Sequence, residues 1–192
     1  NHLINPTTTI TTTNNTNTNP NEQLDTLLRS MLVIAKKGDK ESLLDLLEKI
    51  LHYPHCDLNF KDENGFTALH YACDEGNFKI ADILIKSNCD VNAKTTTNKK
   101  TPLHLTAQRG FFDISKLLIE NGAIVNIGDN EKNTPLHLCA MGGHVELMKF
   151  FLDKLPQANV KNIYGKTPKD VAMKAEIIEL LKEYLDKKDN VY

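Results

Sequence analysis

Residues 101–126 read TPLHLTAQRGFFDISKLLIENGAIVN, and three other segments of the chain copy this pattern. The copies begin at Thr67 (TALHYACDEGNFKIADILIKSNCDVN), at Thr134 (TPLHLCAMGGHVELMKFFLDKLPQAN) and, in shortened form, at Thr167 (TPKDVAMKAEIIELL). Their opening threonines stand 34, 33 and 33 residues apart. Self-similarity at this period predicts an array of stacked repeats rather than one globular core.

The central copy predicts a pair of short helices. Thr101 suits a helix N-cap, and Pro102 suits the first helical position, where its missing N–H is not needed. Gly110 is expected to end this helix in the left-handed conformation. A second helix follows, with an apolar face of Ile114, Leu117 and Leu118. Neither helix is long enough to be stable alone, so each must bury its apolar face against the next copy.

These motifs resemble those of the ankyrin repeat family, and the resemblance covers roughly residues 23–185. It implies an all-α solenoid of stacked helix-turn-helix units joined by short β-hairpin loops, with about five helix pairs including the caps. The expected ankyrin domain spans residues 22–192, with an N-cap at 22–58, repeats at 59–91, 92–125 and 126–158, and a C-cap at 159–192. Residues 1–21 are almost all Asn and Thr, which predicts a disordered tail or linker.

Several segments depart from the repeat pattern. The first unit has five extra residues near residues 52–55, which predicts a longer second helix or a bulge. The turn at residues 94–100 is one residue longer than its counterparts and has no Asp or Gly, so its tip conformation is open. The next turn carries Lys132 where the family has glycine, and Lys169-Asp170 replaces Leu-His in the last unit.

Composition argues against several classes of partner. The net charge is −2, 25% of the residues are charged, and no block of like charge occurs. A nucleic-acid-binding protein would show a basic stripe, so no nucleic acid is expected. No apolar run approaches the length of a membrane span, and the first residues lack the charged and apolar regions of a signal peptide. We therefore expect no membrane association.

The four cysteines (Cys56, Cys73, Cys89 and Cys139) show no paired spacing. They fall where the other copies carry small residues, so they are expected to be reduced, structural thiols. Reduced cysteines predict a cytoplasmic or nuclear protein.

Histidines recur at the repeat period, as His70, His104 and His137. Successive repeats stack about 10 Å apart, which is too far for shared metal ligation. The resemblance instead implies that each histidine forms a hydrogen bond within its own turn. His52, His55 and Cys56 are close together but lack a fourth ligand, so no metal is expected there. No phosphate loop, nucleophile elbow or carboxylate pair occurs, so no cofactor and no catalysis are expected.

Protein binding is the remaining function. The resemblance implies that a partner meets the loop tips and the outward side of each first helix. The candidate contact residues are Phe66, Asp74, Glu75, Lys100, Gln108, Arg109, Met141 and Tyr164. Phe66, Met141 and Tyr164 are the expected apolar anchors, and Arg109 is the expected charged hot spot.

Three functional hypotheses stay open at this point. The first is a monomeric adaptor, scaffold or inhibitor that binds a protein partner. The second is a regulatory or targeting domain of a larger multidomain enzyme such as a protein kinase or transferase, which the start at Asn1 rather than Met favours. The third is scaffolding through self-association.

Overall fold

The computed structural model describes residues 19–54, 56–154 and 157–189, and within these ranges it contains nine helices and no strand. Their bounds are α1 (Pro20–Lys37), α2 (Lys40–Leu51), α3 (Ala68–Asp74), α4 (Phe78–Lys86), α5 (Pro102–Arg109), α6 (Phe112–Glu120), α7 (Pro135–Gly142), α8 (Val145–Lys154) and α9 (Ala175–Asp189). The all-α prediction is therefore confirmed.

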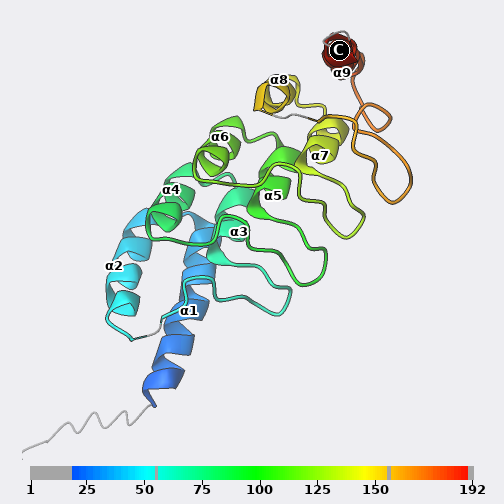
Figure 1. Ribbon diagram of the computed structural model, residues 1–192. Coiled ribbons are helices and arrows are strands. Elements are labelled where there is room, and N and C mark those ends of the chain that lie inside the picture. The colour runs from blue at the N-terminus through cyan, green and yellow to red at the C-terminus, as the bar shows by residue number, and fades with distance from the viewer. Residues whose placement is uncertain (1–18, 55, 155–156, 190–192) are drawn as a thin grey trace, which may run out of the picture.

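The helices form two parallel rows (Figure 1). The first helices α1, α3, α5 and α7 make one row, and the second helices α2, α4, α6 and α8 make the other. The loops between repeats project from the free side of the first row, and we call these projections the fingers. Each helix packs on its neighbours in the array, as in a solenoid.

Local capping explains where the short helices begin and end. Thr67, Thr101 and Thr134 are the N-caps of α3, α5 and α7, and in each case the histidine three residues later completes a capping box. Gly110 ends α5 with φ 80°, which confirms the predicted left-handed conformation.

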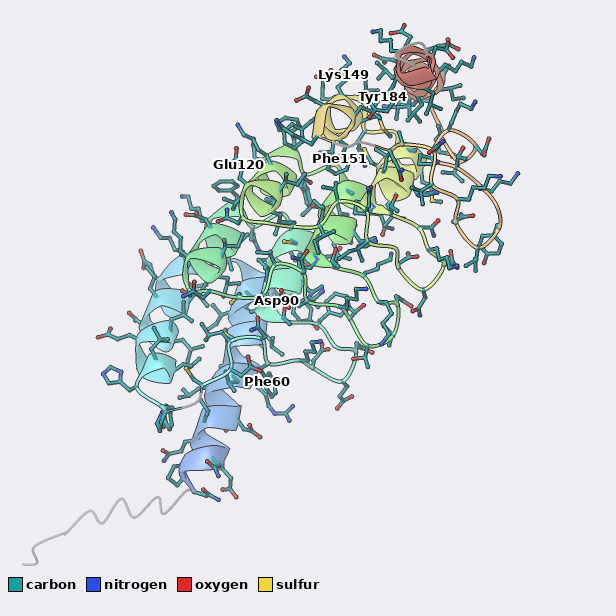
Figure 2. All side chains as sticks on the ribbon, viewed as in Figure 1. Phe60, Asp90, Glu120, Lys149, Phe151 and Tyr184 are labelled. Carbon is teal, nitrogen blue, oxygen red and sulfur yellow. The ribbon has the colours of Figure 1, made fainter. Side chains whose placement is uncertain are left out.

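The core lies between the two rows and runs the length of the array. Its leucines, such as Leu103 and Leu118, are completely buried, and Phe151 fills the space beneath α8. Figure 2 shows Phe151 turned toward α7 while Lys149, on the same helix, points away from the array. Helices of seven to ten residues are held by this burial rather than by intrinsic propensity.

The cysteines belong to the same core. All four are free thiols; Cys73, Cys89 and Cys139 are buried and Cys56 is half-buried. Burial raises the pKa of Cys89 and of Cys139 to about 12, and it raises the pKa of Cys73 further. These thiols therefore stay protonated and unreactive at neutral pH.

The first unit is longer than the repeats that follow it. Helix α1 has 18 residues and begins at Pro20, inside the segment predicted to be a tail; residues 1–18 lie outside the described ranges. Helix α2 has 12 residues where α4 has 9, so the helix takes up three of the five extra residues, and residues 52–54 follow it as a turn. The outer face of this unit exposes Val33, Leu44 and Leu51.

The last unit contains one helix where a pair was expected. Residues 168–171 form hydrogen-bonded turns, with Asp170 N donating to Thr167 O at 3.0 Å, and only α9 follows. Lys169 stands where the other copies have a buried leucine, so this segment lacks the fully buried side chain that anchors each of the other first helices.

Candidate protein-binding surface

Each finger is closed by its own short hydrogen bonds. In the first finger Asp62 N donates to Phe66 O at 3.0 Å, and Asp62 Oδ1 accepts from Asn64 N at 2.9 Å and from Phe66 N at 2.8 Å. Asp129 and Asn162 repeat this arrangement in the third and fourth fingers. The expected β-hairpins are thus tight turns, to which no strand is assigned in the described part of the chain.

The second finger reaches the same closure with different residues. Thr95 replaces the aspartate; its N–H donates to Lys100 O at 2.9 Å, and its Oγ1 accepts from Lys100 N at 3.0 Å. The residue before Lys100 is Lys99, which has φ 55°. The tip conformation that the sequence left open is therefore a left-handed turn, like that of its neighbours.

Backbone hydrogen bonds connect each finger to the next. Thr96 N donates to Asn64 O at 2.9 Å, Asn130 N donates to Asn98 O at 3.0 Å, and Ile163 N donates to Glu131 O at 2.9 Å. Four fingers are therefore fixed side by side as one row. This row is pre-organised, so a partner would not have to order it on binding.

The periodic histidines connect each repeat to the finger that follows it. In the central repeat, His104 Nδ1 accepts from Thr101 N at 3.1 Å, and His104 Nε2 donates to Asn133 O at 3.0 Å. His70 and His137 make the same two contacts with their own threonine and the next finger. The predicted hydrogen bond within the turn is confirmed. The hydrogen bond to the next finger was not predicted, although the recurrence of histidine at the same position of each repeat could have indicated it.

These histidines are held in the neutral form. Because Nδ1 faces donors and Nε2 faces a carbonyl, the hydrogen must sit on Nε2. Burial lowers the pKa of His70 and of His104 to about 4, and it also lowers the pKa of His137. They are structural groups at neutral pH.

The structure brings four of the predicted contact residues together in two pairs. Arg109 donates to both carboxylate oxygens of Asp74, at 3.0 and 3.3 Å, which joins α5 to α3. This hydrogen bond raises the pKa of Arg109. Lys100 Nζ donates to Gln108 Oε1 at 2.9 Å. Glu75 is exposed next to the first pair.

Phe66 does not form the exposed anchor that the sequence predicted. Its side chain is half-buried, and its ring lies 5.5 Å from His70 and 5.2 Å from Tyr71 between ring centroids. Tyr71 in turn donates to Asp62 Oδ2 at 2.6 Å, a bond that raises the pKa of Tyr71 to about 12. Phe66 therefore packs the first finger onto α3.

The two other predicted anchors are accessible. Met141 at the end of α7 is 36% exposed, and Tyr164 at the tip of the fourth finger is 65% exposed. The Tyr164 hydroxyl donates to Glu131 Oε1 at 3.4 Å, which orients the ring along the finger row. A pre-oriented aromatic side chain suits a binding surface.

The described residues contain no group of three or more His, Cys, Asp or Glu side chains that could hold a metal ion. The suggested cluster at His52 and Cys56 includes His55, which lies outside the described ranges. None of the described helices is both long and apolar enough to cross a bilayer.

Two rows of helices with a rigid, chemically varied row of fingers define a helical repeat solenoid. Comparison with known families identifies which one. The family model for ankyrin repeats (3 copies) matches residues 11–95, 30–129, 90–162 and 124–191. The chain belongs to the ankyrin repeat family.

Similar proteins differ widely in kind. Alpha-latrotoxin-Lg1a of Latrodectus geometricus is 38% identical over 98 residues, which is 51% of this chain and 7% of the toxin. The transient receptor potential channel pyrexia of Drosophila melanogaster is 33% identical over 91 residues, 47% of this chain and 9% of the channel. A putative ankyrin repeat protein of Rickettsia bellii is 32% identical over 84 residues, 43% of this chain and 49% of that protein. The matched segment is thus a small part of the toxin and the channel.

Proposed function

We propose that this protein is a non-catalytic protein–protein interaction module that acts as an adaptor, scaffold or inhibitor. Its partner binds the finger face, which we define as the finger tips together with the exposed ends of α3, α5 and α7. Ankyrin repeats are generally protein–protein interaction modules, and this supports the general assignment.

The observation that carries the proposal is the rigid finger row with unlike side chains on it. The finger-to-finger backbone bonds and the histidine bridges fix the row. Along it, Glu75 and the Asp74–Arg109 pair are followed by the neutral Met141 and the exposed Tyr164. A fixed surface whose chemistry changes along its length can select one partner over another.

The test is affinity capture from the native cell with three baits: the wild-type chain, R109E/Y164A and the control K116E/F112A. The control makes the same two types of change on α6, where Phe112 is 38% exposed and Lys116 is exposed. A protein captured by wild type and control but lost by R109E/Y164A is then purified, and its affinity is measured. We expect the finger-face variant to bind at least about tenfold more weakly. Equal loss in the control, or unchanged affinity in R109E/Y164A, would place the interface elsewhere.

A second proposal is that the array is a regulatory or targeting part of a larger multidomain enzyme, such as a protein kinase or transferase. The observation that favours a larger chain is the small share of the latrotoxin and channel relatives that the match covers. An immunoblot of the native cell with an antibody to this array distinguishes the two proposals. A band at the mass of 192 residues supports the stand-alone module, and a much larger band supports the second proposal.

We also propose that the module is a monomer, and that it lies in the cytoplasm or nucleus, where its free cysteines would stay reduced. Sedimentation at micromolar concentration tests the monomer, since self-association would favour scaffolding instead. A fluorescent fusion tests the compartment.

A further inference from the structure

A hollow of about 770 Å³ lies among the first three fingers. Four lysines line it: Lys61 from the first finger, Lys94 and Lys99 from the second, and Lys132 from the third. The rest of its wall comes from polar and backbone groups of the same fingers, namely Thr95, Thr96, Gly128, Asp129 and Asn130. Neither the repeat pattern nor the family resemblance predicts this cluster of charge.

The positive charge of the hollow is not balanced by the side chains that line it. All four lysines are exposed, and none of them forms an ion pair with a carboxylate of the described residues. Lys61 donates to Lys94 O at 3.0 Å, which places its ammonium group over the base of the second finger. Asp129 is the one carboxylate in the wall, and its Oδ1 already accepts from Glu131 N and Asn133 N. Four lysines against one aspartate leave a formal charge of +3.

Two of these lysines occupy positions that favour glycine. Lys99 and Lys132 have φ 55° and 57°, whereas the corresponding residues of the first and fourth fingers are Gly65 and Gly165, with φ 80° and 70°. A residue with a Cβ is disfavoured in this left-handed region. Strained residues of this kind are commonly found at functional sites. The two fingers that lack glycine at this left-handed position are the two that put these extra lysines into the hollow.

We propose that this lysine hollow binds an acidic peptide segment, rich in Asp and Glu, of the protein partner. This inference rests on the proposed function and names the chemistry that the partner presents. Three adjacent fingers contribute the four ammonium groups, so an extended acidic segment crossing the finger row meets them in sequence. Lysines act as point charges that suit single carboxylates, so four of them along the row suit successive acidic side chains.

A nucleic acid fits the hollow less well. Its lining contains no aromatic ring on which a base could stack and no arginine that could grip a phosphate with two parallel hydrogen bonds. The chain as a whole is acidic, with a net charge of −2, so it offers no long basic stripe for a phosphate backbone. A short acidic segment needs only the local charge.

The test uses a fluorescein-labelled octaglutamate peptide, with octaglutamine as the neutral comparison, and the full chain at low salt. The test variant is K99G/K132G, which restores the residue found in the flanking fingers. The control is K40Q/K79Q, which removes two exposed lysines from the starts of α2 and α4 and changes the net charge by the same amount. We expect wild type and control to bind octaglutamate equally and K99G/K132G to bind about tenfold more weakly. Binding to octaglutamine should be absent.

Stability gives a second readout. Because glycine relieves the strained φ at both positions, the melting temperature of K99G/K132G should equal or exceed that of wild type. A lower melting temperature would contradict the inference that these lysines adopt an unfavourable φ because they take part in binding. Equal weakening in K40Q/K79Q would show a general charge effect and overturn the proposal.

Three further outcomes decide the occupant. No octaglutamate binding by wild type would overturn the inference. Tighter binding of a single-stranded oligonucleotide with the same number of charges, lost in K99G/K132G, would replace the peptide by a nucleic acid. If a captured partner is lost by R109E/Y164A but retained by K99G/K132G, the proposed function stands and the lysine hollow does not contribute to it.

Discussion

The central and final units begin with the same two residues, Thr-Pro, yet only the central one forms a first helix. In the central unit, His104 bonds to Thr101 on one side and to Asn133 O of the next finger on the other. In the final unit, Asp170 Oδ2 accepts from Thr167 N at 2.8 Å and from Thr167 Oγ1 at 2.7 Å. Both residues therefore complete the cap.

The difference is that histidine has a second, donating nitrogen and aspartate has none. His104 can cap its helix and reach forward at once, and it is completely buried between two repeats. Asp170 is exposed and only caps. The cap alone does not produce a first helix in this unit, where Lys169 and Asp170 replace the buried leucine and the bridging histidine of the other copies.

Of the changes considered, lowering the pH should have the largest effect on stability, and the effect should differ between the central and final units. The pKa of His70 and of His104 is about 4 in the folded chain, against an ordinary value of 6.5, so the unfolded chain binds protons more readily. Their stabilisation is therefore complete above pH 6.5 and is lost as the pH falls toward 4, by on the order of 3 kcal/mol for each histidine. Urea unfolding at a series of pH values measures this loss.

The final unit should respond in a lower range of pH. Hydrogen bonds from Thr167 lower the pKa of Asp170 below its ordinary 3.8, so its contribution persists until the pH falls below about that value. Circular dichroism that showed the central helices stable at pH 4 would contradict the assignment of the histidines as neutral bridges.

Replacing His104 by Asp would give the central unit the residue of the final unit. The cap can be kept, but Asn133 O loses its donor inside the array, and a carboxylate is placed in a buried site. We expect the free energy of unfolding to fall by about 3 kcal/mol. Denaturant unfolding measures it, with D170N in the exposed final unit as the control. A loss below that of the control would show that the bridge does not stabilise the array.

Gly110→Val and Gly165→Ala compare the central unit with the final unit at two glycines that have a left-handed conformation. A Cβ at Gly110 would collide with the ring of His144 from the next repeat, whereas at Gly165 it would meet nothing within 4 Å. We expect a loss of about 2 kcal/mol or more at Gly110, from collision and strained φ together, and about 1 kcal/mol at Gly165 from φ alone. Thermal melting of both variants and of Gly110→Ala separates the two causes. An unaltered unfolding curve for Gly110→Val would refute the assignment.

Asp170→Ala should have the smallest effect. It removes an exposed cap from a segment that forms only turns, so we expect a loss of about 0.5–1 kcal/mol. Hydrogen exchange should show faster exchange of amides in α9 and no change in α5. Faster exchange in α5 would mean that the final unit supports the whole array.

The sequence predicted most of the fold because repeated local signals agree with one another. Thr101, Pro102 and Gly110 define the bounds of a helix by local chemistry, and the same signals recur in the other copies. The final unit was harder, because its Thr-Pro start predicts a helix while Lys169 and Asp170 replace the leucine and histidine that hold the other first helices in place. Two local signals disagree there, and the sequence alone does not show which one prevails.

The binding surface was predicted only in part. Met141 and Tyr164 are accessible as expected, because they lie at positions that the repeat geometry places outside the core. Phe66 packs inward, because Tyr71 from α3 offers its ring a partner that the finger sequence alone does not reveal. The Asp74–Arg109 pair joins residues 35 apart, and its geometry depends on how adjacent repeats are rotated.

The forward reach of the histidines has a consequence for synthesis of the chain. His70 finds its carbonyl 30 residues downstream, and His104 and His137 find theirs 29 residues downstream. As the polypeptide emerges from the ribosome, the histidine of each repeat can form this hydrogen bond only after the following finger has been made. The most recently synthesised repeat of the growing array therefore lacks the bond, and a nascent chain that stalls at this stage exposes that repeat to chaperones and proteases.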